Sequence, residues 1–177
     1  MQNDLNAIYR QANVQVRVRS VIDYSDSLYN PSTIFDNPSS RNDRYTRQMR
    51  ELRDRFFEAH PNFKKNAYVI FLIPGFNDEK IHGYMTRNRA MAFIKHEQEG
   101  KYITSTAREL ARGMGMLDHY WLKWNNTQPG LTTNLMDNTE GIDLNQSQWD
   151  RLRHSSNSHS FYDGDEDVKT NNGMVAY

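Results

Sequence analysis

The sequence contains no cysteine. Disulfide bonds, cysteine-based catalysis and zinc sites with thiolate ligands are therefore excluded. The chain also lacks an excess of charge, because its 22 Lys and Arg residues are balanced by 22 Asp and Glu residues. A balanced chain does not produce the positive field of a general nucleic-acid binder or of a protein bound to an anionic membrane, so we expect no nucleic-acid partner.

Long hydrophobic runs are missing as well. The longest run, residues 68–73, is far shorter than the roughly 20 residues that cross a bilayer, so we expect no membrane span. The first residues are polar and no apolar segment follows them, which predicts no signal peptide in this chain. With 177 residues, of which 37% are hydrophobic, the chain is long enough for one domain, and two independent cores would be a tight fit.

The hydrophobic periodicity predicts an α+β fold. Apolar residues at helical spacing predict four helices, over residues 3–12, 42–60, 104–116 and 144–152. Three strands are predicted: 14–18, where Val alternates with polar residues, 67–73, a continuous apolar run typical of a central buried strand, and 90–94.

The remaining segments are predicted to be loops. Residues 23–42 and 125–143 are rich in polar and turn-forming residues. Thr106 and Glu109 have the spacing of a capping box at the start of the third helix. We therefore expect one domain over residues 1–154 with a small mixed sheet, followed by a polar tail over residues 155–177.

The segment with the clearest chemical pattern begins with Arg-Glu-Leu-Ala-Arg at Arg108 and ends at His119. In zinc peptidases, two His residues at i and i+4 bind the metal from one face of a helix. A Glu beside the first His acts on the metal-bound water, and a third ligand follows the helix. Here the spacing and the Glu are present, but Arg108 and Arg112 stand at the two His positions.

Further motifs follow in order: Thr-Asn-Leu-Met-Asp over residues 133–137, then Gly141, Leu144 and Gln-Trp-Asp over residues 148–150. Together they resemble a zincin-like, metzincin-type metallopeptidase domain that forms the terminal toxin domain of bacterial secreted effectors and polymorphic toxins. Members of that family look alike in three successive motifs: His-Glu-x-x-His-Gly, then Leu-x-His, then an Asn-Leu-Met-Asp turn. The resemblance covers about residues 5–154 and is dense from residue 104 to residue 154.

The resemblance implies a zincin-like domain with a central active-site helix, a Met-turn and a C-terminal helix. It places Glu109 at the catalytic general base, His119 at the third zinc ligand and Met136 in the structural turn. Arg108 and Arg112 replace the first two ligands. A guanidinium has no lone pair to give a metal and stays cationic, so we expect no cofactor in this chain, whereas an intact relative would bind zinc.

We therefore expect a zinc-metallopeptidase-type toxin or effector domain whose zinc site is disabled, and no proteolysis. The resemblance implies a peptide or protein target, a cognate immunity protein as a partner, and delivery or secretion from a bacterium within a larger effector. The alternatives are a non-catalytic pseudoenzyme that binds a partner, an inhibitor that mimics a peptidase, and an active enzyme with relocated ligands. In a simpler reading, Arg108 and Arg112 form a solvated helix face on which Glu109 pairs with Arg112.

Overall fold

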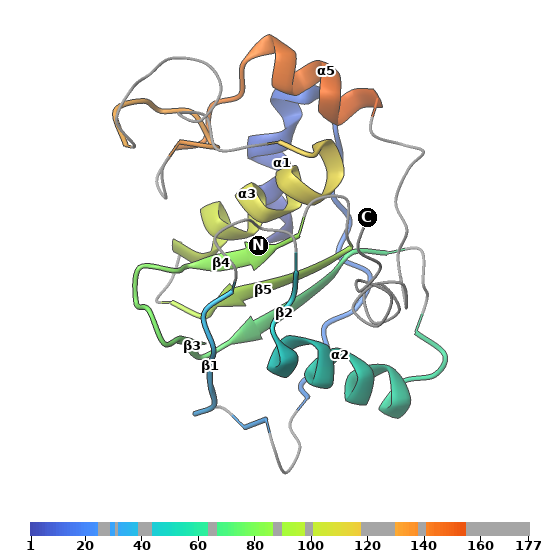
Figure 1. The fold of residues 1–177 in the computed structure, drawn as a ribbon. Helices are drawn as coiled ribbons and strands as arrows, with labels where there is room; N and C mark the ends of the chain where they lie inside the picture. Colours follow the sequence, from blue (N-terminus) through green and yellow to red (C-terminus); the bar gives the residue numbers. More distant parts are fainter. Residues whose placement is uncertain are drawn as a thin grey trace, which may run out of the picture.

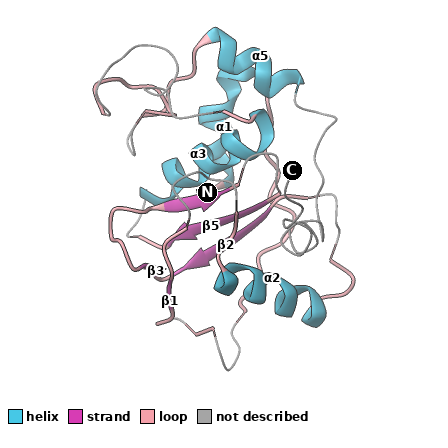
Figure 2. Ribbon diagram, viewed as in Figure 1, coloured by secondary structure: helices cyan, strands magenta, loops and turns pink. Residues whose placement is uncertain are grey.

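The computed structural model describes residues 1–24, 29–30, 32–38, 44–63, 67–86, 90–97, 101–117, 130–137 and 141–154. Over these residues the fold is α+β, as predicted (Figures 1 and 2). The helices are α1 (Gln2–Tyr9), the 3-10 helix η1 (Arg10–Ala12), α2 (Arg47–Ala59), α3 (Lys101–Gly115) and α5 (Gln146–His154). The strands are β1 (Ile34–Phe35), β2 (Val69–Ile73), β3 (Gly75–Phe76), β4 (Gly83–Met85) and β5 (Met91–Lys95).

The main sheet has the strand order β2-β5-β4. Strand β2 runs parallel to β5, with Val69 opposite Met91, and β4 runs antiparallel to β5, with Tyr84 opposite Phe93. The sheet is therefore small and mixed. Strand β2 was predicted to be central, but it is an edge strand, and β5 is the central one. The apolar run of β2 is long because Phe71 packs in the core on one face of the sheet and Ile70 packs in the core on the other face.

Helices cover both faces of the sheet (Figure 1). On one face Phe71 and Phe93 pack against α2, whose buried residues are Met49, Leu52 and Phe56. These three residues and Tyr45 have the helical spacing that predicts this helix. On the other face α3 packs against β4 and β5, and α1 and α5 pack against α3. This layer of helices contains the candidate site. No helix in the described part of the chain is long and apolar enough to cross a membrane.

The strand predicted over residues 14–18 is absent from the structure. Instead, the backbone of this segment bonds to side chains of α1. Asn6 accepts a hydrogen bond from the Val16 N–H at 2.7 Å and donates one to the Val16 carbonyl at 3.0 Å, and Gln2 accepts from the Val18 N–H at 2.7 Å. Side-chain amides therefore satisfy these backbone groups, and no described strand pairs with the segment.

The predicted capping box is also wrong. Helix α3 begins at Lys101, so Thr106 lies inside the helix. Its hydroxyl donates to the Tyr102 carbonyl at 2.7 Å, one turn earlier, which is a common bond for Thr in a helix interior. The loop expected over residues 125–143 is irregular wherever it is described, and the predicted tail over residues 155–177 lies outside the described residues.

Candidate functional site

Helix α3 places the three residues of the altered motif on its buried side. Arg108, Glu109 and Arg112 are exposed to only 8%, 3% and 3%. The helix passes close to β4 at this point, because a Cβ atom on Gly83 would lie 3.1 Å from the Glu109 Cγ. The reading in which Arg108 and Arg112 form a solvated helix face is therefore wrong, although the i,i+3 pair that it predicted is present.

Glu109 and Arg112 form a buried ion pair. The Arg112 Nη1 donates to the Glu109 Oε2 at 2.8 Å, and both side chains are about 95% buried. Burial raises the pKa of Glu109 above its usual value, while Arg112, Arg108 and a hydrogen bond from the Met85 backbone act to lower it. The predicted contact between Glu109 and an arginine is thus present for Arg112.

Arg108 reaches from α3 to the loop at residues 130–137. Its Nε donates to the Leu135 carbonyl at 2.8 Å, and its Nη2 is buried without a hydrogen-bond partner among the described residues. Burial lowers the pKa of Arg108 to about 10, with Arg112 acting in the same direction and Glu109 and Asp137 opposing it. Arg108 therefore remains a cation at neutral pH, held against the loop by one strong hydrogen bond.

The loop over residues 130–137 is held in shape by Asp137. Its carboxylate accepts hydrogen bonds from the Gly130 N–H at 3.0 Å and from the Thr132 N–H and hydroxyl at 2.7 and 2.6 Å. Although burial acts to raise it, these bonds hold the pKa of Asp137 below its usual range. Met136 is completely buried in the turn and packs in the same core as Leu110 of α3.

A pair of amide side chains joins this loop to α5. Asn134 donates to Gln148 at 2.8 Å and Gln148 donates back to Asn134 at 3.0 Å, and both residues are buried. Gly141 lies against the same turn, because a Cβ atom there would be 2.2 Å from the Asn134 carbonyl oxygen. Gly141 and the Gln-Trp-Asp motif can be recognised in the sequence, whereas this pairing was not predicted, although the neighbouring amide-bearing motifs could have suggested it.

The structure thus brings Arg108, Glu109, Arg112 and Met136 together, while His119 lies outside the described residues. The residues that are described do not fit a zinc site. Two guanidinium groups stand where ligands would have to be, and they repel a dication. Nowhere in the described ranges do three or more His, Cys, Asp or Glu side chains gather closely enough to hold a metal ion.

The chemistry open to this cluster is limited. Glu109 is engaged by Arg112, and a guanidinium is too weak a base to accept a proton at neutral pH. Arg108 therefore joins the helix to the loop by one charge-assisted hydrogen bond, and Glu109 and Arg112 form an ion pair within the helix. No model of a protein family matches the sequence, and no curated protein and no solved structure matches it either.

Proposed function

We propose that this chain is a zincin-like metallopeptidase domain of the bacterial toxin or effector type, and that it has lost hydrolytic activity. One observation carries the proposal: the Arg-Glu-Leu-Ala-Arg motif is buried on α3 directly against the Asn-Leu-Met-Asp turn. These two motifs are separated by about twenty residues in the sequence. Their contact is what a zincin-like site requires, in which a turn with a buried methionine supports the residues of the active helix.

Two further contacts support the same arrangement. Gly141 allows the chain to approach the Asn134 carbonyl, and Gln148 of the Gln-Trp-Asp motif bonds to Asn134 in the turn. Among the described residues, the motifs behind the resemblance therefore lie in one region, which supports the proposal. The implied target protein, immunity protein and delivery from a bacterium are part of this proposal.

The loss of activity follows from the residues themselves. The Arg108 guanidinium is bonded to the Leu135 carbonyl, and the Arg112 guanidinium is bonded to Glu109, the matched general base. Arg112 occupies one of the two oxygens of the Glu109 carboxylate, so that oxygen is not available to accept a proton from a bound water. In the chain as it stands, the three residues at the motif positions stabilise the fold.

The test is to restore both ligands with Arg108→His/Arg112→His. We expect this variant to bind zinc at micromolar concentration, measured by calorimetry and by metal analysis of the purified protein, and to cleave casein. Each single variant should bind zinc far more weakly, because one cation remains beside the metal. Adding His119→Ala to the double variant should abolish tight binding if His119 is the third ligand.

A matched control separates a built site from any pair of histidines on a helix. Arg47→His/Glu51→His creates an i,i+4 pair on the exposed face of α2, where Arg47 and Glu51 now form an ion pair at 2.6 Å. This control should bind zinc weakly and cleave nothing. If the Arg108→His/Arg112→His variant is folded but binds zinc no more tightly than the control, the zincin-like assignment is wrong.

A second candidate function is a non-catalytic module that binds a partner protein. The buried ion pair favours it, because the Arg112 guanidinium compensates the buried charge of Glu109 within the chain itself. The two functions differ in one measurement. Proteolysis by the restored variant supports descent from a peptidase, while unaltered capture of a partner by the original and the restored chain supports a binding role that is independent of the site.

A further inference from the structure

We propose that a groove between residues 15–24 and β2 binds an extended segment of a partner protein, which adds a strand to the edge of β2 that no described strand pairs with. The partner segment is acidic and has apolar residues at alternate positions. This site lies on the edge of the sheet opposite to β4 and does not depend on the function proposed for the Arg108 cluster.

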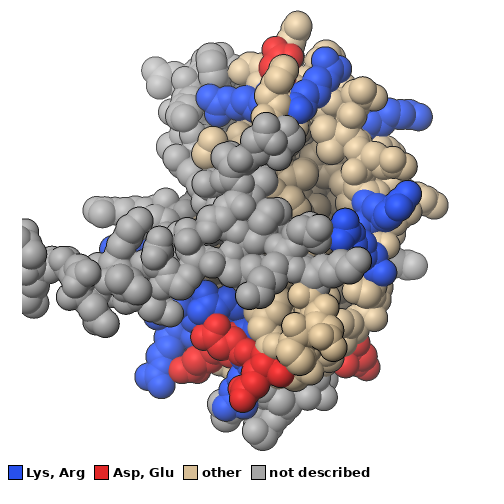
Figure 3. Space-filling model, turned by 90° about the vertical axis from the view of Figure 1, so that its right-hand side faces the viewer, with Lys and Arg blue, Asp and Glu red and all other residues tan. Residues whose placement is uncertain are grey.

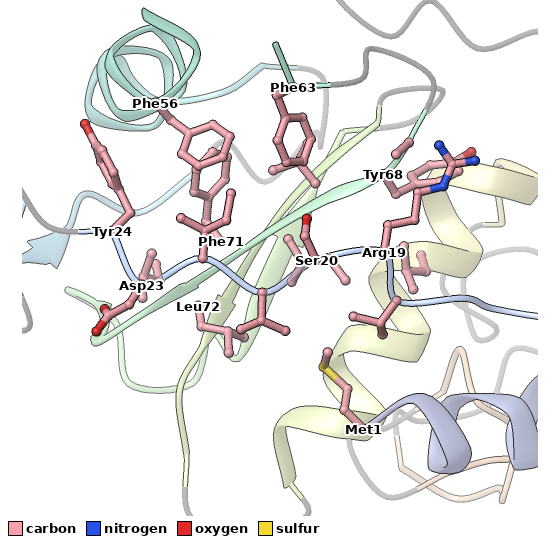
Figure 4. Close-up of a pocket in the computed structure, with 18 of the residues that line it drawn as sticks. Met1, Arg19, Ser20, Asp23, Tyr24, Phe56, Phe63, Tyr68, Phe71 and Leu72 are labelled. Carbon is pink, nitrogen blue, oxygen red and sulfur yellow. The ribbon is translucent and has the colours of Figure 1, made fainter. Parts of the chain in front are cut away.

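The groove is large and its floor is aromatic. Its volume is about 1570 Å³, above the roughly 300–1,000 Å³ typical of small-molecule sites, so a length of polypeptide suits it better. Phe56, Phe63 and Phe71 contribute to its lining, and their rings lie close together (Figure 4). The ring centroids of Phe56 lie 5.3 Å from Phe63 and 5.4 Å from Phe71.

The edge of β2 that borders the groove offers backbone hydrogen bonds. In the parallel pairing with β5, the Val69 N–H donates to the Ala90 carbonyl at 2.8 Å and the His96 N–H donates to the Ile73 carbonyl at 2.7 Å. Alternate residues of a strand direct their backbone groups to opposite sides, so those of Ile70 and Leu72 point away from β5. Within the described ranges nothing bonds to them, and such an edge is a template for an added strand.

Apolar side chains are exposed along the rim of the groove. Leu72 of β2 is 47% exposed, and Val21 and Ile22 of the opposite wall are 85% and 39% exposed. Three apolar residues from two segments that border one groove mark a surface suited to contact with another chain. In Figure 4 the wall segment, on which Asp23, Ser20 and Arg19 are labelled, crosses in front of β2.

The charge of the groove selects the partner. The lining includes two exposed basic residues, Arg17 and Arg19. Among the described lining residues, Asp23 is the single acidic residue. Figure 3 views the right-hand side of Figure 1 and shows Lys and Arg side chains at the upper, right and lower margins of the described surface, with Asp and Glu side chains at the upper and lower margins. A strand with acidic residues at alternate positions would meet these arginines while its apolar residues face the aromatic floor.

The binding test uses a fluorescein-labelled peptide of seven residues in which Val alternates with Asp or Glu. The length slightly exceeds the five residues of β2. We expect saturable binding by fluorescence anisotropy in the micromolar range. Two control peptides, one with Lys in place of the acids and one with Pro at the two central Val positions, should bind at least tenfold more weakly.

Variants of the protein locate the binding site. Arg17→Glu/Arg19→Glu should weaken binding at least tenfold, and so should Leu72→Asp, which puts a negative charge on the rim. Arg44→Glu/Arg151→Glu changes the net charge equally at exposed positions outside the lining, and it should bind like the original chain. Equal binding by all variants, or no binding of the peptide, would overturn the proposal.

Hydrogen exchange at β2 gives an independent readout. The amides of Ile70 and Leu72 should exchange rapidly in the free protein and at least tenfold more slowly with saturating peptide. Slow exchange in the free protein would mean that another segment of the chain or a second copy already covers the edge, and either result overturns the proposal. Size-exclusion chromatography would distinguish these two occupants.

Discussion

Replacing Arg112 by Met should destabilise the protein in a manner that depends on pH. Methionine retains the length of the arginine side chain but removes the charge that now lies 2.8 Å from the Glu109 Oε2. Glu109 would then be a buried carboxylate without its bonded cation. Burial already raises the pKa of Glu109, and the loss of Arg112 removes the largest influence that lowers it.

The size of the effect follows from the burial of the pair. Opposite charges about 4 Å apart attract by about 4 kcal/mol at an effective dielectric constant of 20. Breaking a buried pair by removing one partner typically costs about 3–5 kcal/mol. In a chain of this size each kcal/mol lowers the melting temperature by roughly 2–4 °C, so we expect a loss of roughly 10 °C near pH 8.

The direction of the pH dependence is fixed by the pKa of Glu109. An acid with a higher pKa in the folded than in the unfolded state binds more protons when folded, so stability falls as pH rises between the two values. The unfolded value is about 4.3. Arg112→Met should therefore approach the stability of the original chain near pH 4.5 and lose stability progressively toward pH 8.

Thermal melts followed by circular dichroism at several pH values test this prediction. Arg47→Met is the matched control, because Arg47 forms an exposed ion pair with Glu51 and exposed pairs contribute little to stability. Arg112→Met/Glu109→Leu should be more stable than Arg112→Met at pH 8, because no carboxylate remains buried. An Arg112→Met variant that loses the same stability at pH 4.5 and pH 8 would refute the electrostatic reasoning.

Three further predictions concern the loop beneath α3. Gly141→Ala should cost at least about 2 kcal/mol in a denaturant titration, because the new Cβ meets the Asn134 carbonyl, a backbone group that cannot turn aside. Gly115→Ala is the milder control, because its Cβ meets only side-chain atoms of two leucines, at 3.1 Å or more. Gln148→Leu should cost about 1–3 kcal/mol because it leaves the buried amide of Asn134 without its partner, and Gln148→Leu/Asn134→Leu should cost less than the sum of the two single changes. The pKa of Asp137 is lowered in the folded protein, so the ionised carboxylate stabilises the fold at pH values above its unfolded pKa of about 3.9. This stabilisation is lost as the pH falls through the folded pKa. Thermal melts of Asp137→Asn should therefore show the largest loss of stability, relative to the original chain, at neutral pH and no loss in strong acid.

The elements that could be predicted are those whose signal is local. The spacing of Met49, Leu52 and Phe56 predicts α2 because one buried helix face needs apolar residues at that period. The order of strands in the sheet depends on long-range pairing, so the longest apolar run gave no information on whether β2 or β5 is central.

The alternation of Val14, Val16 and Val18 failed as a strand signal for a related reason. The pattern is real, since these side chains are half-buried and the residues between them are exposed. A strand also needs a backbone partner, and in this structure the side chains of Gln2 and Asn6 take the partner's place. In the sequence, Gln2 and Asn6 are simply polar residues of a predicted helix, and nothing about them indicates that they bind the backbone of the next segment.

The candidate site could be predicted in outline only. The order of the motifs indicated that Arg108, Glu109 and Met136 belong together, and the structure places them in one region. The hydrogen bond from Arg108 to the Leu135 carbonyl joins residues 27 positions apart, and no spacing within a helix reveals such a contact. Burial of two arginines on one helix also contradicts the ordinary expectation that Arg lies at the surface.

The buried triad of Arg108, Glu109 and Arg112 restricts how this protein can change over generations. Replacing Arg112 alone leaves Glu109 as a buried carboxylate without its bonded cation. Replacing Glu109 alone leaves two buried cations in the same packed region. Each single replacement is therefore harmful, while a joint replacement can be nearly neutral, so the three positions are epistatic. In a set of related sequences they should vary as one unit, with either all three of these residues or a compatible set in their place.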